Sequence, residues 1–114
     1  MRAVAALAAV CATAVACGSH EPRLKRVDSA PLISLTQRIA REGPCARRRD
    51  LSTLRTRAIA LVNRHAVPSA LQEPFVSAVN ELASHAVTCA PGTESTVVKE
   101  QARDLSAWLE KNSR

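Results

Sequence analysis

The chain has 114 residues, a formal net charge of +6 at pH 7 and an aromatic content of 2%. This length is enough for one domain with one modest core and excludes a large multidomain architecture. The scarcity of aromatic residues disfavours a β-sandwich and favours helices that pack through leucine, valine, isoleucine and alanine.

The first 16 residues have the organisation of a secretory signal peptide. Arg2 supplies a positive charge, and Ala3–Ala16 is an apolar stretch of 14 residues. A transmembrane helix needs about 20 apolar residues, so this stretch is too short to span a bilayer and instead has the length of a signal-peptide core. Small residues directly before Cys17 suit cleavage at that point. We therefore assign residues 1–16 to a signal peptide.

The sequence Ala14-Val15-Ala16-Cys17, followed by glycine and serine, resembles the lipobox of bacterial lipoproteins. It departs from the usual motif at Ala14, where that motif has leucine. In bacterial lipoproteins the cysteine sulfur receives a diacylglycerol, and cleavage then frees the amino group. The resemblance implies that Cys17 is lipidated and that the protein is exported and anchored to the outer face of the bacterial cell membrane. A secreted form without lipid and an uncleaved leader are the alternatives.

The residues after Cys17 are expected to form a flexible polar stalk, so that residues 17–30 link the lipid to the domain. The stretch GSHEPRLKRVDSA has no apolar periodicity. Arg23, Lys25 and Arg26 would stand just above the membrane and could rest on anionic headgroups, at about 1 kcal/mol each. A stalk surrounded by solvent is the alternative.

The folded domain is expected to span residues 31–114, with helices near residues 31–42, 46–66, 70–88 and 95–110. Each of these segments has apolar residues spaced by three and four, which is the pattern of a helix that buries one face. The expected core positions are Leu32, Leu35, Ile39, Leu51, Leu54, Ala58, Leu61, Val62, Leu71, Phe75, Val79, Leu82, Ala86, Val98, Ala102, Leu105 and Leu109. Val76, Ala83 and Val87 are expected to widen the apolar face of the third helix to about half of its circumference.

Capping residues and prolines set the expected helix boundaries. Ser29 and Ser69 are the expected N-caps of the first and third helices, and Gly43 is expected to end the first. Pro68 cannot continue the hydrogen-bond ladder of a helix, so the second helix should end before it. The second and third helices should therefore form an antiparallel hairpin with its turn at Val67–Pro68.

Cys45 and Cys89 lie at equal distances from residue 67 in the sequence. Positions equidistant from the turn of an antiparallel pair lie side by side, so the two thiols are expected to meet at the open end of the hairpin. With Cys17 lipidated, these two cysteines remain in the mature chain, and exported proteins generally oxidise such pairs. A disulfide would stabilise the domain by about 3–5 kcal/mol, and two buried free thiols are the alternative. The expected fold is all-α, a small three- to four-helix bundle built on an antiparallel helical hairpin closed by a disulfide.

Positive charge is concentrated in the first half of the chain. Residues 23–64 carry 11 basic and three acidic side chains, whereas residues 65–114 carry four basic and six acidic ones. Arg47, Arg48 and Arg49 form the densest cluster and are candidate contacts for an anionic surface, with a solvated face as the other interpretation. No aromatic residue is interleaved with the arginines, so nucleic acid is not an expected partner.

The sequence offers no evident catalytic or metal-binding set. His85 and Cys89 are four residues apart, which is a ligand spacing on a helix, but two ligands do not complete a zinc site. No Ser-His-Asp set and no glycine-rich phosphate loop suggest themselves. We therefore expect no metal, no cofactor, no small-molecule substrate and no enzymatic activity.

Residues 45–89, which include VPSALQEPFVSAVNEL between the two cysteines, resemble uncharacterised small exported helical proteins of high-GC Gram-positive bacteria. This resemblance transfers no catalytic or binding residues. The expected function is that of a non-enzymatic helical interaction module at the cell envelope, with an envelope protein as partner. Binding of an anionic envelope polymer or lipid through the basic half is the alternative, and a small enzyme is the least favoured hypothesis.

Overall fold

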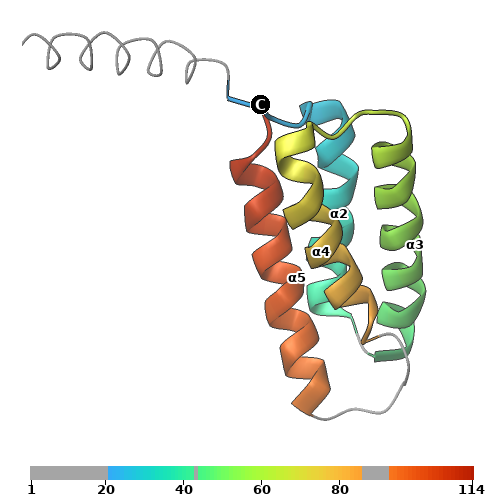
Figure 1. The fold of residues 1–114 in the computed structure, drawn as a ribbon. Helices are drawn as coiled ribbons and strands as arrows, with labels where there is room; N and C mark the ends of the chain where they lie inside the picture. Colours follow the sequence, from blue (N-terminus) through green and yellow to red (C-terminus); the bar gives the residue numbers. More distant parts are fainter. Residues whose placement is uncertain (1–20, 43, 86–92) are drawn as a thin grey trace, which may run out of the picture.

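The computed structural model describes residues 21–42, 44–85 and 93–114, apart from the side chains of residues 44, 45 and 93–95. Over these ranges the chain forms a bundle of helices that run alternately up and down (Figure 1). The helices are α2 (Arg26–Arg41), α3 (Pro44–Asn63), α4 (Ser69–Ala83) and α5 (Thr93–Lys111). The all-helical bundle expected from the sequence is confirmed.

Several sequence-based expectations fall outside the described residues. They concern the signal peptide, the lipidation of Cys17, the helix-ending role of Gly43 and the disulfide between Cys45 and Cys89. None of the helices in the described part of the chain is long and apolar enough to cross a membrane.

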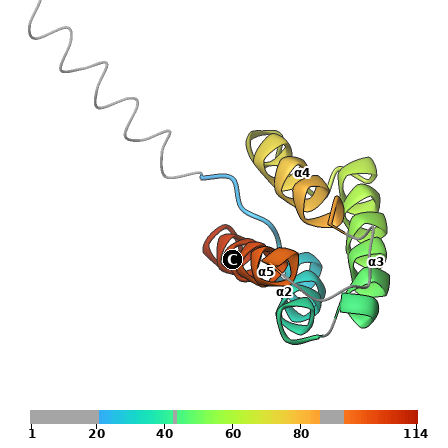
Figure 2. The ribbon, with the colours of Figure 1, turned by 90° about the horizontal axis from the view of Figure 1, so that it is seen from below.

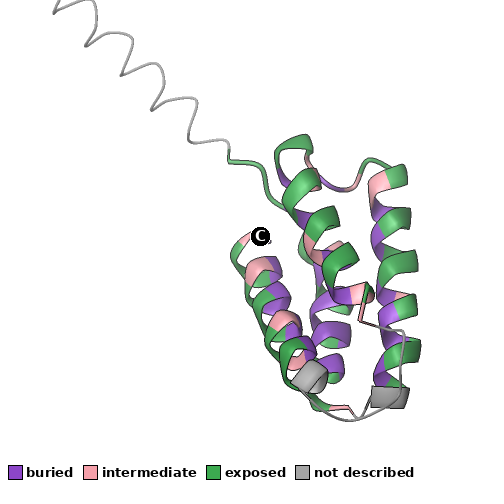
Figure 3. Ribbon diagram, turned by 60° about the horizontal axis from the view of Figure 1, so that its bottom comes forward, coloured by how far each residue is buried: buried purple, intermediate pink, exposed green. Residues whose placement is uncertain are grey.

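Each helix packs against its neighbour in the sequence, and α5 returns to pack against α2, so the four helices surround one core (Figures 1 and 2). The contact between α2 and α5 is the most extensive of these. Figure 3 shows that buried residues face the inside of the bundle and that exposed residues cover its outside.

The core is almost entirely aliphatic, and most of the core positions expected from the helical spacing are buried. Val62 and Ala83 are only partly buried, and Val76, which was expected on the apolar face of α4, is 36% exposed. Ala86 and Val87 lie outside the described residues.

The single aromatic member of the core is Phe75 on α4, which is fully buried and stacks against Trp108 on α5, with ring centroids 6.1 Å apart. The buried apolar side chains outside the expected set are those of Leu24, Ile33, Ala40 and Val67. Burial of these aliphatic faces is the main favourable contribution to folding.

The first helix begins earlier than the sequence pattern indicates, and this corrects the expected stalk. α2 starts at Arg26 with Lys25 as its N-cap, so Ser29 is a helical residue rather than the cap. Ser29 and Leu24 are both fully buried. Ser29 continues the three-and-four spacing of the buried face by one turn, but a serine was not counted as a core residue, and the helix start was therefore placed too late.

α3 and α4 form the expected antiparallel hairpin, although α3 ends at Asn63 instead of residue 66. His65 has a φ of 61°. Its amide donates to the carbonyl of Val62 at 3.1 Å, and the amide of Ala66 donates to the carbonyl of Leu61 at 2.9 Å. These two bonds and the left-handed residue make a Schellman motif, which satisfies carbonyls at the helix end.

The connection continues to Pro68, which is the N-cap of α4, so Ser69 is the first helical residue and not the expected cap. The side-chain amide of Gln72 donates to the carbonyl of Val67 at 3.1 Å and ties α4 to the preceding turn. The turn expected at Val67–Pro68 thus lies within the observed connection, and buried Val67 anchors it to the core.

α4 is shorter than expected, because it ends at Ala83 and not near residue 88. The hydroxyl of Ser84 donates to the carbonyl of Glu81 at 2.6 Å, and the amide of His85 donates to the carbonyl of Leu82 at 3.3 Å. These local bonds tighten the last turn and take up carbonyls that a longer helix would have used.

The residues before α2 pair with the residues after α5. The amide of Leu24 donates to the carbonyl of Asn112 at 2.8 Å, and the amide of Arg114 donates to the carbonyl of Leu24 at 3.1 Å. Leu24 and Ser113 form an isolated parallel bridge. The two segments therefore lie side by side at one end of the bundle (Figure 1), and we call this the termini end.

Candidate functional site

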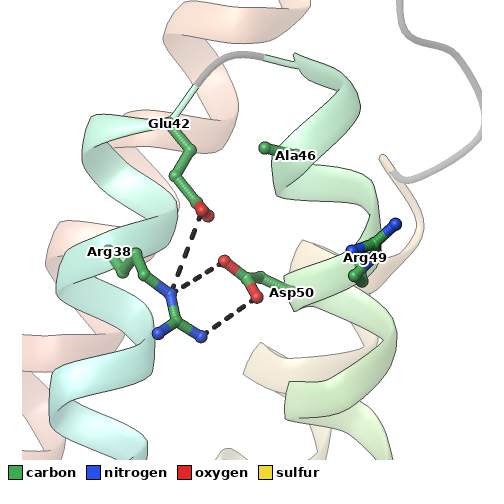
Figure 4. Close-up of a pocket in the computed structure, with 5 residues that line it drawn as sticks. All are labelled: Arg38, Glu42, Ala46, Arg49 and Asp50. Atoms are coloured by element: carbon green, nitrogen blue, oxygen red, sulfur yellow. Dashed lines mark hydrogen bonds and ion pairs between the residues drawn. The ribbon is translucent and has the colours of Figure 1, made fainter.

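Charged side chains from two helices line an open hollow of about 510 Å³ at the end of the bundle opposite the termini end. We call it the acidic hollow after its two carboxyl groups. Figure 4 shows that Arg38 and Glu42 come from the end of α2, while Asp50 comes from the facing turns of α3. Ala46 and Arg49 complete the lining.

Arg38 and Asp50 form a two-pronged ion pair between α2 and α3. The guanidinium Nε of Arg38 donates to Oδ2 of Asp50 at 3.0 Å, and a terminal nitrogen donates to Oδ1 at 3.1 Å. Such fork-to-fork pairing fixes orientation as well as distance. It holds the last turn of α2 against α3 across the short connection between them.

Glu42 lies beside this ion pair, but its carboxyl group has weaker contacts with Arg38 than Asp50 has. Its Oε2 is 3.9 Å from Nε of Arg38, and its side chain is 22% exposed, while its Oε1 has no hydrogen-bond partner among the described residues. Burial raises the pKa of Glu42, and the adjacent Asp50 carboxylate raises it further. The positive charges of Arg38 and Arg47 oppose this shift without cancelling it.

Asp50 behaves in the opposite way. Burial opposes its ionisation, but hydrogen bonds from Glu42 and Arg38 and the positive charges of Arg38 and Arg49 outweigh burial, so the pKa of Asp50 is lowered. The hydrogen bond to Asp50 likewise raises the pKa of Arg38. Two neighbouring carboxyl groups with pKa values pushed apart can hold one proton between them.

The chemistry that this hollow supports is limited by its geometry. Paired carboxyl groups with separated pKa values can act as an acid and a base, but structural ion-pair networks produce the same shifts. Asp50 already uses both oxygens in its bond to Arg38. We therefore infer that these charged side chains serve to hold α2 and α3 together. Among the described residues, no three His, Cys, Asp or Glu side chains lie together as a metal site would need.

The arginine cluster at the start of α3 is split by the structure. Arg48 and Arg49 are exposed, whereas Arg47 is only 3% exposed, and its guanidinium donates to the backbone carbonyl of Glu42. Arg47 is thus turned toward the connection between α2 and α3, away from the surface on which it was expected. Only two of the three arginines remain available to an external anion.

The basic residues of the expected stalk lie far from that cluster. Arg23, Lys25 and Arg26 are exposed at the termini end, whereas Arg48 and Arg49 are in the first turns of α3 at the opposite end (Figure 1). The structure therefore does not bring the candidate anionic contacts into one patch.

The ion pair between Arg38 and Asp50 was missed in the sequence, although a signal for it exists. Both residues are six positions from residue 44 in the connection between α2 and α3. Equal distance from a turn is the criterion that was applied to Cys45 and Cys89, and it would have paired Arg38 with Asp50.

A comparison of the chain with protein-family models, with curated proteins and with solved structures gives no match.

Proposed function

We propose that this protein is an exported lipoprotein, anchored by lipid on Cys17, whose helical bundle is a non-enzymatic interaction module at the cell envelope. The observation that carries the proposal is the lipobox-like sequence of residues 14–17. Leu24, which is 0% exposed and bonded to the C-terminal segment, fixes where the bundle begins after Cys17. Because the chain is fastened to the bundle at this residue, a lipid on Cys17 would hold the whole domain at the membrane.

The length of the tether follows from the same observation. Residues 18–23 separate Cys17 from Leu24, and at about 3.6 Å per residue this segment spans at most about 25 Å. This is far less than a stalk ending at residue 30 would allow. In this proposal the bundle works within a narrow layer above the membrane.

The proposed interaction surface consists of exposed apolar residues on α3 and α4. Ile59 on α3 is 49% exposed, and Val76 on α4 is 36% exposed. A hollow on α4 lies beside Val76 and is lined by Ser69, Gln72, Glu73 and Ser77. Exposed apolar side chains with a polar rim are typical of protein-binding surfaces, so we assign an envelope protein as the partner.

The anchor is tested by membrane fractionation and mass spectrometry. The wild-type protein should partition into the detergent phase and have a mature N-terminus at Cys17 with a diacylglycerol mass added. Cys17→Ser should accumulate as the uncleaved precursor. A mature N-terminus at Cys17 without added lipid would show that the protein is secreted.

The partner is tested by photo-crosslinking in intact cells, with the reactive residue at position 59 or 76. Matched controls place it at Arg57 and Asn80, which are exposed on the same two helices. The proposal requires one envelope protein that is crosslinked from positions 59 or 76, at low and physiological salt alike, and not from the controls. Crosslinking from every arginine position that falls steeply with salt would instead favour an anionic polymer.

A further inference from the structure

The termini end brings together three parts of the chain that are far apart in sequence. They are the segment before α2, the connection between α3 and α4, and the last residues of α5 (Figure 1). The backbone bonds between Leu24 and residues 112 and 114 fix the first and the last of these to each other. This end is therefore a defined surface of the bundle and not a loose stalk.

Basic side chains dominate this surface. Its acidic residues are Glu21, Asp28 and Glu110, and its basic residues are Arg23, Lys25, Arg26, Arg64, Lys111 and Arg114. Two of the acidic groups are held in local ion pairs, Glu21 with Arg23 at 3.3 Å and Asp28 with Arg64 at 2.8 Å.

Four basic groups of this surface, those of Lys25, Arg26, Lys111 and Arg114, and one acidic group, that of Glu110, are in no ion pair among the described residues. Lys25, Arg26 and Lys111 are exposed. They come from both sides of the bridge between Leu24 and Ser113. A cationic surface assembled in this way complements a plane of negative charge better than a single groove.

The same surface carries an apolar side chain. Val27, in the first turn of α2, is 77% exposed and is the most exposed large hydrophobic residue in the described part of the chain. It directly follows Lys25 and Arg26. Basic residues beside an exposed apolar one are the combination that binds the boundary between lipid headgroups and acyl chains, where charge and apolar burial both contribute.

We propose that the termini end rests on anionic lipid headgroups, with Lys25, Arg26 and Lys111 contacting phosphates and Val27 entering the headgroup layer. This inference rests on the proposed lipid anchor, because the tether of at most about 25 Å keeps this end next to the bilayer. It gives the bundle an orientation. The helices stand on the membrane, and the acidic hollow points away from it.

The test uses the lipidated mature protein, extracted from membranes and reconstituted into vesicles. One set of vesicles is phosphatidylcholine, and the other contains about a third phosphatidylglycerol, as a source of anionic headgroups. Hydrogen exchange is followed in peptides that cover residues 22–28 and 109–114, with residues 44–52 as the reference from the opposite end. We expect slower exchange at the first two in phosphatidylglycerol vesicles only, and reversal of this effect by high salt.

Charge-reversal variants identify the residues responsible. Lys25→Glu/Arg26→Glu/Lys111→Glu should lower the ratio of docked to undocked protein by at least about a hundredfold, since each basic residue near a membrane surface contributes about fivefold. Arg48→Glu/Arg55→Glu/Arg57→Glu changes the net charge equally at exposed positions on α3 and should leave the protection intact. Val27→Ser should weaken docking, and the matched Val97→Ser, at an exposed valine near the start of α5 at the opposite end of the bundle, should not. Circular dichroism checks that each variant is folded.

The outcomes separate this inference from the proposed function. Protein with lipid on Cys17 that shows no protection at residues 22–28 and 109–114 would overturn the orientation and leave the anchor in place. Equal loss of protection in the two triple variants would also overturn it. A mature chain without lipid would overturn the anchor and the orientation together.

Discussion

Leu24 is bonded on both sides to the C-terminal segment: its amide donates to Asn112, and its carbonyl accepts from the amide of Arg114 across the bridge to Ser113. Its side chain is fully buried. A residue expected in a flexible stalk therefore closes one end of the bundle. It links the two ends of the described chain by backbone and side chain together.

Leu24→Ala should destabilise the bundle by about 2–5 kcal/mol, because it removes a fully buried side chain and leaves a cavity. Chemical denaturation monitored by circular dichroism measures the free energy of unfolding. The matched control is Val27→Ala, three residues away and exposed, which should change that free energy by no more than about 0.5 kcal/mol. Equal effects of the two substitutions would show that Leu24 is outside the core.

Glu42→Gln should stabilise the protein near neutral pH and lose this effect in acid. The raised pKa of Glu42 means that the native state favours its protonated form. That contribution is fully present below the unfolded pKa and is lost as pH rises through the native pKa. Glutamine removes the cost of ionising a buried carboxyl group beside Asp50. Thermal unfolding at pH 7 and at pH 3 would reveal the difference, and a gain that persists unchanged at pH 3 would contradict it.

Asp50→Asn should have the opposite pH dependence. The pKa of Asp50 is lowered, so its ionised form stabilises the native state above the unfolded pKa, and this contribution is lost as pH falls through the native value. The variant should melt below the wild type at pH 7 and approach it at low pH. Arg57→Gln, at an exposed position on α3, is a control that should show no comparable dependence.

His65→Gly should stabilise the hairpin by about 0.5–1 kcal/mol. A non-glycine residue in the left-handed region bears a steric cost of about 1–2 kcal/mol, which is partly offset by the greater freedom of glycine in the unfolded chain. His65→Val should destabilise, because β-branched residues tolerate this region poorly. Denaturation of both variants tests the Schellman motif. A stabilising valine or a destabilising glycine would be incompatible with the left-handed backbone at this position.

The disulfide between Cys45 and Cys89 remains a prediction. Non-reducing peptide mapping should find these two residues joined, and reduction should lower the melting temperature by well over about 10 °C. This follows from about 3–5 kcal/mol of stabilisation and about 4–8 °C per kcal/mol in a domain of this size. Finding either cysteine free, or joined to Cys17, would show that the pairing is wrong.

The sequence pattern predicted the interior of the bundle better than its ends. The three-and-four spacing of leucine, valine and isoleucine identified the buried faces of all four helices, because a helix with one apolar face has few other ways to bury it. Pro68 located the hairpin connection, since proline cannot continue a helix.

Helix boundaries and contacts between charged side chains were harder to predict from the sequence. Ser29 was interpreted as a cap because serine is frequent there, but its spacing placed it in the core. α4 ends earlier than expected, with local hydrogen bonds of Ser84 and His85 at its end. The spacing of hydrophobic residues does not predict such bonds. The ion pair of the acidic hollow depends on how α2 and α3 face each other across a turn, and the equal spacing of Arg38 and Asp50 from residue 44 is its signal in the sequence. The exposure of Arg48 and the burial of Arg47 also follow from that packing.

The extensive contact between α2 and α5 has a consequence for when the chain can fold. α2 is the first helix of the bundle to be synthesised, and its main partner is the last. At roughly 5–20 residues per second, several seconds pass before α5 follows. Until then the apolar face that contains Leu32, Leu35 and Ile39 lacks its main partner, and contacts between distant segments form slowly. The core of the bundle can therefore be completed only after α5 has been synthesised.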